Sequence, residues 1–170
     1  MTKTTAWLLG SILAVAGLAT GFNSLYNDNS STLKFAFITQ SAFDCSQVTD
    51  VPQTECEALV ALYDSTDGDN WKRNTNWKTN NQACTWHGVN CAGAWVTELY
   101  LTYNQLSGPI PSQLTNLSKL ETLHLGGNQL SGPIPSELGK LSQLQRLQLH
   151  TNQLSGPIPS ELGKLSQLQN

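Results

Sequence analysis

The sequence predicts an α/β repeat fold, a right-handed solenoid with a short parallel β-sheet on its concave face and a helical cap before its first coil. Residues 128–145 and 152–169 are the same eighteen residues, NQLSGPIPSELGKLSQLQ, offset by twenty-four. Leucines recur at fixed positions within that period, and a segment rich in tryptophan and cysteine precedes it. An internal period of this length is typical of repeat architectures, in which function lies on a repeated surface.

The first residues predict export. Lys3 gives a positive start, Trp7 to Ala19 form an apolar stretch, and small residues follow, as in a secretory signal peptide. A membrane-spanning helix needs about 20 apolar residues, and this stretch has thirteen. We expect a signal peptide at 1–21, with cleavage after Ala19 or Gly21; an uncleaved signal anchor is the alternative. Residues 22–44 are predicted to be a linker, in which 33–38 could form a strand that pairs with the cap.

A cap is expected over residues 45–95. Thr54 and Glu57 have the spacing of a capping box, and the apolar residues that follow indicate a helix to about Ser65. The polar run STDGDNW should end this helix. Four tryptophans lie within the next twenty-five residues, which is many for a small loop unless they cover the open end of the first coil; they are Trp71, Trp77, Trp86 and Trp95.

Four cysteines fall in or beside this cap, at positions 45, 56, 84 and 91. They allow three disulfide connectivities, and the residues alone do not choose among them. Cys84, His87 and Cys91 carry zinc-binding groups, but their spacing fits no standard zinc knuckle. The exported context favours disulfides over zinc.

The repeat region is expected to span 96–170. Three full units begin at Val96, Leu120 and Leu144, and a fourth begins at Leu168. Each reads L-x-x-L-x-L-x-x-N-x-L-S-G-P-I-P-S-x-L-x-x-L-S-x, with valine opening the first. The alternation L-x-L predicts a strand with one buried face, whose parallel neighbours lie roughly 4.8 Å apart. The apolar positions should stack from coil to coil, as in Leu99, Leu101, Leu106, Ile110, Leu114 and Leu117 on Leu123, Leu125, Leu130, Ile134, Leu138 and Leu141.

Two further features of the unit have structural roles. Asn104, Asn128 and Asn152 follow the strands, where a stacked side-chain amide can bond backbone groups that the turn leaves unpaired. The G-P-I-P step supplies a glycine for unusual backbone angles and prolines that stop a helix. We expect this step to shape the convex side.

The last coil is expected to leave apolar side chains uncovered. No polar capping unit follows it, and solenoids usually need one. The exposed leucines should be Leu144, Leu147, Leu149 and Leu154. We therefore expect the array to continue beyond Asn170, or another molecule to cover this end.

These residues resemble the plant-type leucine-rich repeat, with its signature L-x-x-L-x-L-x-x-N-x-L-S-G-x-I-P-x-x-L-x-x-L-x-x. The segment from Glu55 to Cys91, with EALVALYDSTDGDNW and CTWHGVNC, is similar to the N-terminal capping domain of that family. The resemblance implies a disulfide between Cys84 and Cys91 and leaves Cys45 with Cys56. Receptor-like proteins, receptor-like kinases and polygalacturonase inhibitors share this architecture, so the resemblance implies the fold more closely than the function.

Several functions find no support in the residues. The formal charge is −3 with no basic patch, which argues against nucleic-acid binding. No hydrolase, zinc-protease, phosphate-loop or kinase motif occurs, so we expect no enzyme and no cofactor or metal. The turn with Asp64, Asp67 and Asp69 lacks the residue order of a calcium-binding loop. His124 and His150 lie on adjacent predicted strands but at different positions along them, so two surface histidines are expected rather than a metal site. Outward threonine rows, expected of an ice-binding surface, are absent.

The second and third units differ at only five of twenty-four positions, all on or beside the strand. They are Glu121/Gln145, Thr122/Arg146, His124/Gln148, Gly126/His150 and Gly127/Thr151. Exposure alone does not explain this, because Ser136, Lys140 and Gln143 should also be solvated and are repeated unchanged. Chance or recombination between repeats is the alternative explanation.

Outward strand positions should form columns across the concave sheet. The predicted ligand-binding residues are Glu98, Tyr100, Thr102, Tyr103, Thr122, His124, Arg146, Gln148, His150 and Thr151, beside Gly126 and Gly127. We expect a non-enzymatic, secreted or cell-surface module (periplasmic or envelope if bacterial) that recognises a protein, peptide or glycan, as a monomer or as part of a longer array. The alternative is a structural, adhesive or receptor-ectodomain fragment. Sequons at Asn29 and Asn116 matter only where N-glycosylation occurs.

Overall fold

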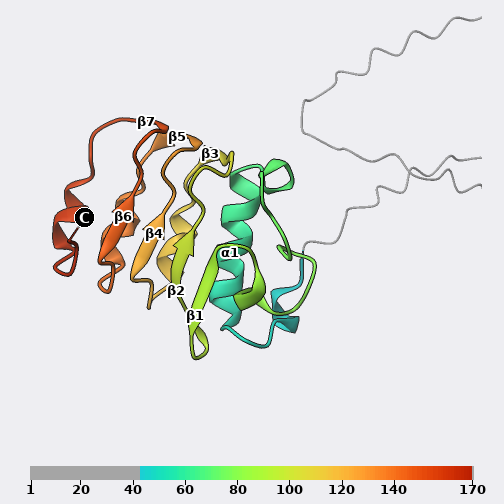
Figure 1. Cartoon of the computed structure of the whole chain (residues 1–170). Coiled ribbons are helices and arrows are strands. Elements are labelled where there is room, and N and C mark those ends of the chain that lie inside the picture. The colour runs from blue at the N-terminus through green and yellow to red at the C-terminus, as the bar shows by residue number, and fades with distance from the viewer. Residues whose placement is uncertain (1–42, 170) are drawn as a thin grey trace, which may run out of the picture. The chain divides into compact units, whose positions relative to one another are not determined.

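The computed structural model describes residues 43–169. The predicted signal peptide and nearly all of the predicted linker, with the suggested strand at 33–38, lie outside the described residues. The described part begins with a short 3-10 helix (Cys45–Gln47) and helix α1 (Gln53–Ser65), and it continues as stacked coils that carry short strands (Figure 1). Each coil advances by one repeat, as the 24-residue period predicts.

The predicted parallel sheet is present. Its strand order is β1-β2-β4-β6, with bounds Val89–Ala92, Trp95–Tyr100, Thr122–His124 and Arg146–Gln148. β2, β4 and β6 are parallel and in register at the 24-residue spacing, so that Leu99 pairs with Leu123 and Leu123 with Leu147. The cap adds β1, which runs antiparallel to β2.

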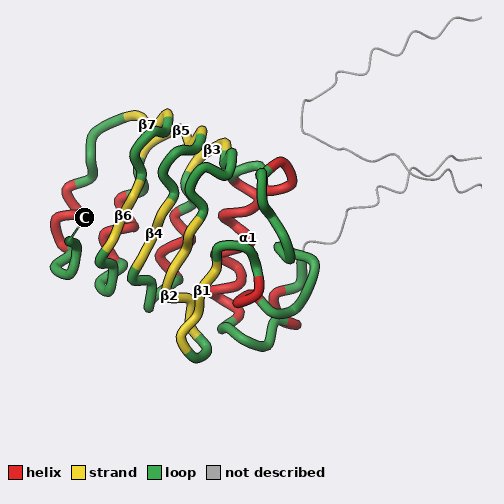
Figure 2. Tube along the Cα trace, viewed as in Figure 1, coloured by secondary structure: helices red, strands yellow, loops and turns green. Residues whose placement is uncertain are grey.

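A second parallel sheet was not predicted. It consists of β3 (Ser107–Pro109), β5 (Gln129–Pro133) and β7 (Gln153–Ser155), and Figure 2 shows it along the edge of the coils next to the first sheet. Glycine and proline made this segment resemble a turn. Because the coils stack, however, this extended segment lies beside the corresponding segment of the next coil. The two pair at a spacing of 22 residues, Ser107 with Gln129 and Ser131 with Gln153.

Short 3-10 helices complete each coil, at Ser112–Asn116, Ser136–Lys140 and Ser160–Lys164. Each begins directly after the second proline of the G-P-I-P step, which suits the first turn of a helix because its missing N–H has no acceptor there. The leucine of each first turn points inward, and Leu114 and Leu138 are fully buried. The predicted leucine stack is therefore confirmed as the core.

The asparagines form the predicted hydrogen-bonded ladder. Asn128 Oδ1 accepts bonds from the backbone N–H groups of Asn104 (2.9 Å) and Leu106 (3.1 Å), and its Nδ2 donates to the carbonyls of Leu101 (2.9 Å) and Leu125 (2.8 Å). Asn104 bonds both backbone groups of Arg73 in the same way, which extends the ladder into the cap. A side-chain amide thus ties each coil to the one before it.

The predicted capping box of α1 is wrong. The helix begins at Gln53 after Pro52, and no side chain caps it. Gln53 Nε2 instead donates to Glu57 Oε1 across one turn, at 2.8 Å. Proline fixes the helical entry by its own backbone angle, so the predicted Thr54–Glu57 pairing is not formed.

Three of the four tryptophans cover the first coil as predicted. Trp71, Trp77 and Trp86 are buried and pack in succession, with ring centroids 4.9 and 5.1 Å apart. Tyr63 stacks on Trp77, and burial raises the pKa of its hydroxyl to about 12. Trp95 is the exception. It opens β2 beside the hairpin turn and is 42% exposed.

Both disulfides implied by the resemblance are present, Cys45–Cys56 and Cys84–Cys91. The second uses both sulfurs of the zinc alternative, which removes that alternative. Asp50 adds a further link, because its two carboxylate oxygens accept bonds from the N–H groups of Ala83 and Cys84, each at 2.9 Å. These bonds join the segment before α1 to the segment that contains Cys84.

The last coil is less covered than the one before it. Leu147, Leu149 and Leu154 are half-buried, whereas their counterparts in the second unit are fully buried, and Ile158 is 77% exposed. The predicted exposure of Leu144 is wrong. The following segment stacks on its coil, with Gln169 N–H donating to the carbonyl of Gln145 at 2.8 Å, and Leu144 is buried.

Candidate binding surface

The outward columns form on the sheet as the register requires. Glu98, Thr122 and Arg146 pair across β2, β4 and β6, and so do Tyr100, His124 and Gln148. The ladder continues past the strands, since Tyr103 N–H donates to the carbonyl of Gly126 (3.1 Å) and Gly127 N–H to that of His150 (2.9 Å). All ten predicted surface residues therefore lie on this strip, but they differ in how far they reach solvent.

Thr122 does not reach the surface. It is 1% exposed, and Arg146 Nη1 donates to its hydroxyl at 3.3 Å. The longer arginine of the next coil lies over the shorter threonine, so Thr122 supports Arg146 and offers nothing directly to a ligand. At the other end of this column Glu98 accepts a bond from Asn90 of β1, at 2.9 Å. The column thus carries a negative group at one end and a positive group at the other.

The second column has an aromatic centre. The rings of Tyr100 and His124 meet edge to face, with centroids 5.0 Å apart. Burial, reinforced by the positive charge of Arg146, lowers the pKa of His124 below its ordinary value. Its Nε2 is buried and has no hydrogen-bond partner among residues 43–169. The imidazole is therefore neutral near pH 7 and holds an unused polar atom beneath the surface.

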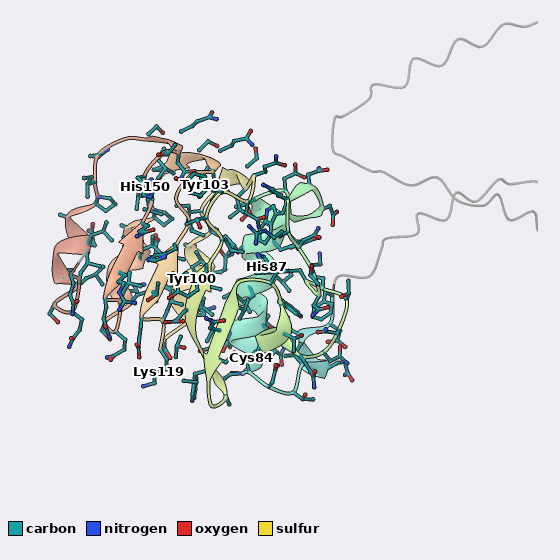
Figure 3. The ribbon with its side chains drawn as sticks, in the orientation of Figure 1. Cys84, His87, Tyr100, Tyr103, Lys119 and His150 are labelled. Carbon is teal, nitrogen blue, oxygen red and sulfur yellow. A yellow bond between two sulfur atoms is a disulfide. The ribbon has the colours of Figure 1, made fainter. Side chains whose placement is uncertain are left out.

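Two rings rest on the paired glycines of the middle coil. A Cβ placed on Gly127 would overlap the ring of Tyr103, and one placed on Gly126 would lie 2.6 Å from Nε2 of His150, with two further ring atoms at 2.9 and 3.0 Å. Three ring atoms at such similar distances place each glycine beneath the face of its ring. Tyr103 comes from the coil before and His150 from the coil after, and Figure 3 shows them next to each other.

The backbone is strained at the same place. Tyr103 and Thr151 adopt left-handed φ angles of 53° and 55°, and Gly127, at the equivalent position between them, has 70°. A left-handed angle is easy for glycine but costs other residues about 1–2 kcal/mol. Strained residues of this kind gather at functional sites. Tyr103 and Thr151 thus carry side chains at a left-handed position that glycine occupies in the middle coil.

The role of Gly126 and Gly127 is what sequence reasoning missed. Both were placed in the columns as small neighbours, and the structure makes them the seats of two rings. Part of the confined variation therefore has a packing cause, because a side chain at either glycine would displace a ring of an adjoining coil. The signal was present in the aligned units, where each glycine stands beside a large residue one coil away, Tyr103 for one and His150 for the other.

Three acidic residues of the cap pair with nearby side chains. Lys78 pairs with Asp64 at 2.6 Å, Asn70 donates to Asp67 at 2.9 Å, and Tyr63 donates to Asp69 at 2.8 Å. Within residues 43–169 no three histidine, cysteine or acidic side chains come together as metal ligands. No helix of that range is long and apolar enough to cross a membrane.

Comparison with known proteins identifies the class to which this geometry belongs. Residues 96–169 match the family model described as leucine rich repeat. The repeat region is thus a leucine-rich repeat array, with a unit of the plant type.

Solved structures extend the likeness to the cap. The BIR2 ectodomain of Arabidopsis thaliana is 35% identical with a TM-score of 0.60, and the alignment covers 71% of this chain and 65% of that one. The ectodomain of the receptor kinase SOBIR1, from the same plant, is 27% identical with a TM-score of 0.60, and the alignment covers 71% of this chain and 65% of that one. The ectodomain of the Arabidopsis thaliana receptor kinase GASSHO1/SCHENGEN3, crystallised with CASPARIAN STRIP INTEGRITY FACTOR 2, is 35% identical with a TM-score of 0.62. The alignment covers 69% of this chain and 14% of that one. The chain therefore spans just under two thirds of the first two ectodomains and a small part of the third.

Proposed function

We propose that this protein is an exported binding module, without catalytic chemistry of its own, that recognises a protein, peptide or glycan through the concave columns. One observation carries the proposal. Between two adjacent coils that are otherwise identical, every difference falls on the strand face and the turn that follows it. Solvated residues on the other side, such as Ser136 and Lys140, are repeated unchanged.

The chemistry of the face supports this proposal. Tyr100 and Tyr103 are 36% and 65% exposed, and aromatic residues are enriched where proteins bind partners. Arg146 and Glu98 add opposite charges that can fix the orientation of a ligand. Three of the matched structures are ectodomains, two of them from receptor kinases, and one of these was crystallised with a partner factor.

Export is supported by two features. The chain has a predicted signal peptide, and two disulfides staple the cap, which suits an oxidising compartment. We place the working module outside the cell or on its surface, as a monomer or as part of a longer array.

The test compares the full-length protein with two fourfold alanine variants in binding to peptide and glycan arrays. One variant replaces Tyr100, Tyr103, His124 and Arg146. The matched control replaces repeated residues of the other side, Ser136, Lys140, Ser142 and Gln143. We expect the first variant to lose ligands that the control retains. Equal binding by both variants would place recognition elsewhere.

A second candidate is the ectodomain part of a longer surface protein with a structural or adhesive role. The SOBIR1, BIR2 and GASSHO1/SCHENGEN3 structures are ectodomains, and the chain covers 65%, 65% and 14% of them. Genomic sequence downstream separates the candidates, because further repeats or a kinase domain would establish the longer protein.

A further inference from the structure

The two seated rings form a preorganised surface, which we call the ring platform: Tyr103 and His150 on Gly126 and Gly127. Each ring has one face against a glycine, so its opposite face is the one turned to solvent. Tyr103 keeps 65% of its surface exposed although its ring is supported from below. His150 is also exposed, and its Nδ1 lies 3.1 Å from the hydroxyl of Thr151. Rings fixed in this way lose little conformational freedom when a ligand binds.

We propose that the ring platform is a saccharide-binding site, which takes a neutral oligosaccharide by stacking sugar rings on Tyr103 and His150. This inference rests on the proposed function and names its ligand class. An aromatic ring is negative over its face, and the axial C–H groups of a hexose are weakly positive, so the flat side of a sugar is attracted to it. Two rings on adjoining glycines offer two such stacking positions.

The neighbours of the ring platform suit sugar hydroxyls. Thr102 lies in the same column as Gly126 and His150, and Gln148 in the next column beside His124; both are half-buried, and Thr151 is exposed next to His150. These hydroxyl and amide groups both donate and accept hydrogen bonds. Glu98 and Arg146 carry opposite charges in a single column and so give the strip no net sign, which favours a neutral ligand over an acidic one.

A protein partner fits this site less well. A standard interface buries about 800 Å² on each partner, and three short strands provide a small face. The strongest anchors of protein interfaces also fill desolvated pockets, whereas Tyr103 stands exposed on a supported ring. A short saccharide buries less surface than a protein partner and can stack on aromatic rings that are exposed to solvent.

The experiment titrates the full-length protein with four neutral β-1,4-linked hexasaccharides: cellohexaose, xylohexaose, mannohexaose and chitohexaose. Calorimetry gives the affinity for the parent and for Tyr103→Ala and His150→Ala. Trp95→Ala is the matched control, because it removes another exposed ring that is not seated on a glycine pair. We expect at least one sugar to bind, each platform variant to weaken it about tenfold or more, and the control to leave it unchanged.

A further variant separates the position of the ring from its presence. Gly127→Ala retains Tyr103 but puts a methyl group where its ring lies, and we expect it to weaken sugar binding as Tyr103→Ala does. Thermal unfolding confirms that each variant is folded; if Gly127→Ala is not, Tyr103→Leu replaces it, as a folded variant with apolar bulk but no ring.

The inference is overturned if none of the four sugars binds, or if Tyr103→Ala binds as the parent does. If peptides bind through Tyr100 and Arg146 while no sugar binds, the proposed function stands and the inference fails. If neither arrays nor sugars give a ligand that depends on the concave face, both fail.

Discussion

Replacing Thr151 by glycine should stabilise the protein. Thr151 is β-branched, exposed and left-handed, with φ at 55°, and the preceding coil has Gly127 at this position with φ at 70°. Relief of the left-handed strain is worth about 1–2 kcal/mol, toward the upper end for a branched residue. The greater freedom of glycine in the unfolded chain offsets about 0.5–1 kcal/mol, and loss of the exposed contact with His150 about 0.5 kcal/mol. The net gain is about 0.5–1 kcal/mol.

Urea denaturation followed by tryptophan fluorescence measures this gain, and calorimetry should show a midpoint about 2–3 °C higher. Thr151→Ala is the matched control, because it removes the hydroxyl but keeps a Cβ in the left-handed conformation. We expect it to remain within about 0.5 kcal/mol of the parent. If both variants had the same stability, the strain assigned to this position would not exist.

Three further predictions concern the framework. Asn128→Ala should cost about 3–5 kcal/mol in urea denaturation, because several buried backbone groups lose their partner, whereas Asn152→Ala, which is half-buried, should cost less than half as much; equal costs would refute the ladder as a source of stability. Gly108→Ala should destabilise far more than Gly93→Ala, since both have positive φ but only the first would meet a backbone carbonyl, and comparable unfolding midpoints would contradict this. Burial raises the pKa of the Glu55 carboxyl above its ordinary value of 4.5, so its contribution to the free energy of unfolding is full below about pH 4.5 and is lost as pH rises through the folded-state pKa. Glu55→Gln should therefore flatten the dependence of stability on pH between about pH 4 and 7. An unchanged pH dependence would exclude this carboxyl as its cause.

The array was predictable because its signal is periodic. Leu99, Leu123 and Leu147 repeat at one spacing, and stacking follows from the spacing alone. The asparagine ladder was predictable for the same reason. The second sheet escaped prediction because Gly108 and Pro109 are poor strand residues in isolation, and only the register of the coils makes the segment pair.

The sequence predicted which residues share a column of the surface, but not how far each side chain is exposed to solvent. Alternation places Thr122 outward, but burial depends on the length of the side chain one coil away, and Arg146 covers it. The flat seating of Tyr103 depends equally on the absence of a Cβ at Gly127. Such effects arise between coils, whereas the sequence pattern describes each coil by itself.

The central claim is that ligand binding depends on the five strand-face positions at which the second and third units differ. A coil-copy variant tests it by giving the third unit the residues of the second: Gln145→Glu, Arg146→Thr, Gln148→His, His150→Gly and Thr151→Gly. The measurement is calorimetric affinity of the full-length variant for the hexasaccharide that the parent binds, with its unfolding midpoint recorded in parallel. The account predicts that the midpoint stays the same or rises while binding is lost. Undiminished affinity in a folded coil-copy variant would contradict it.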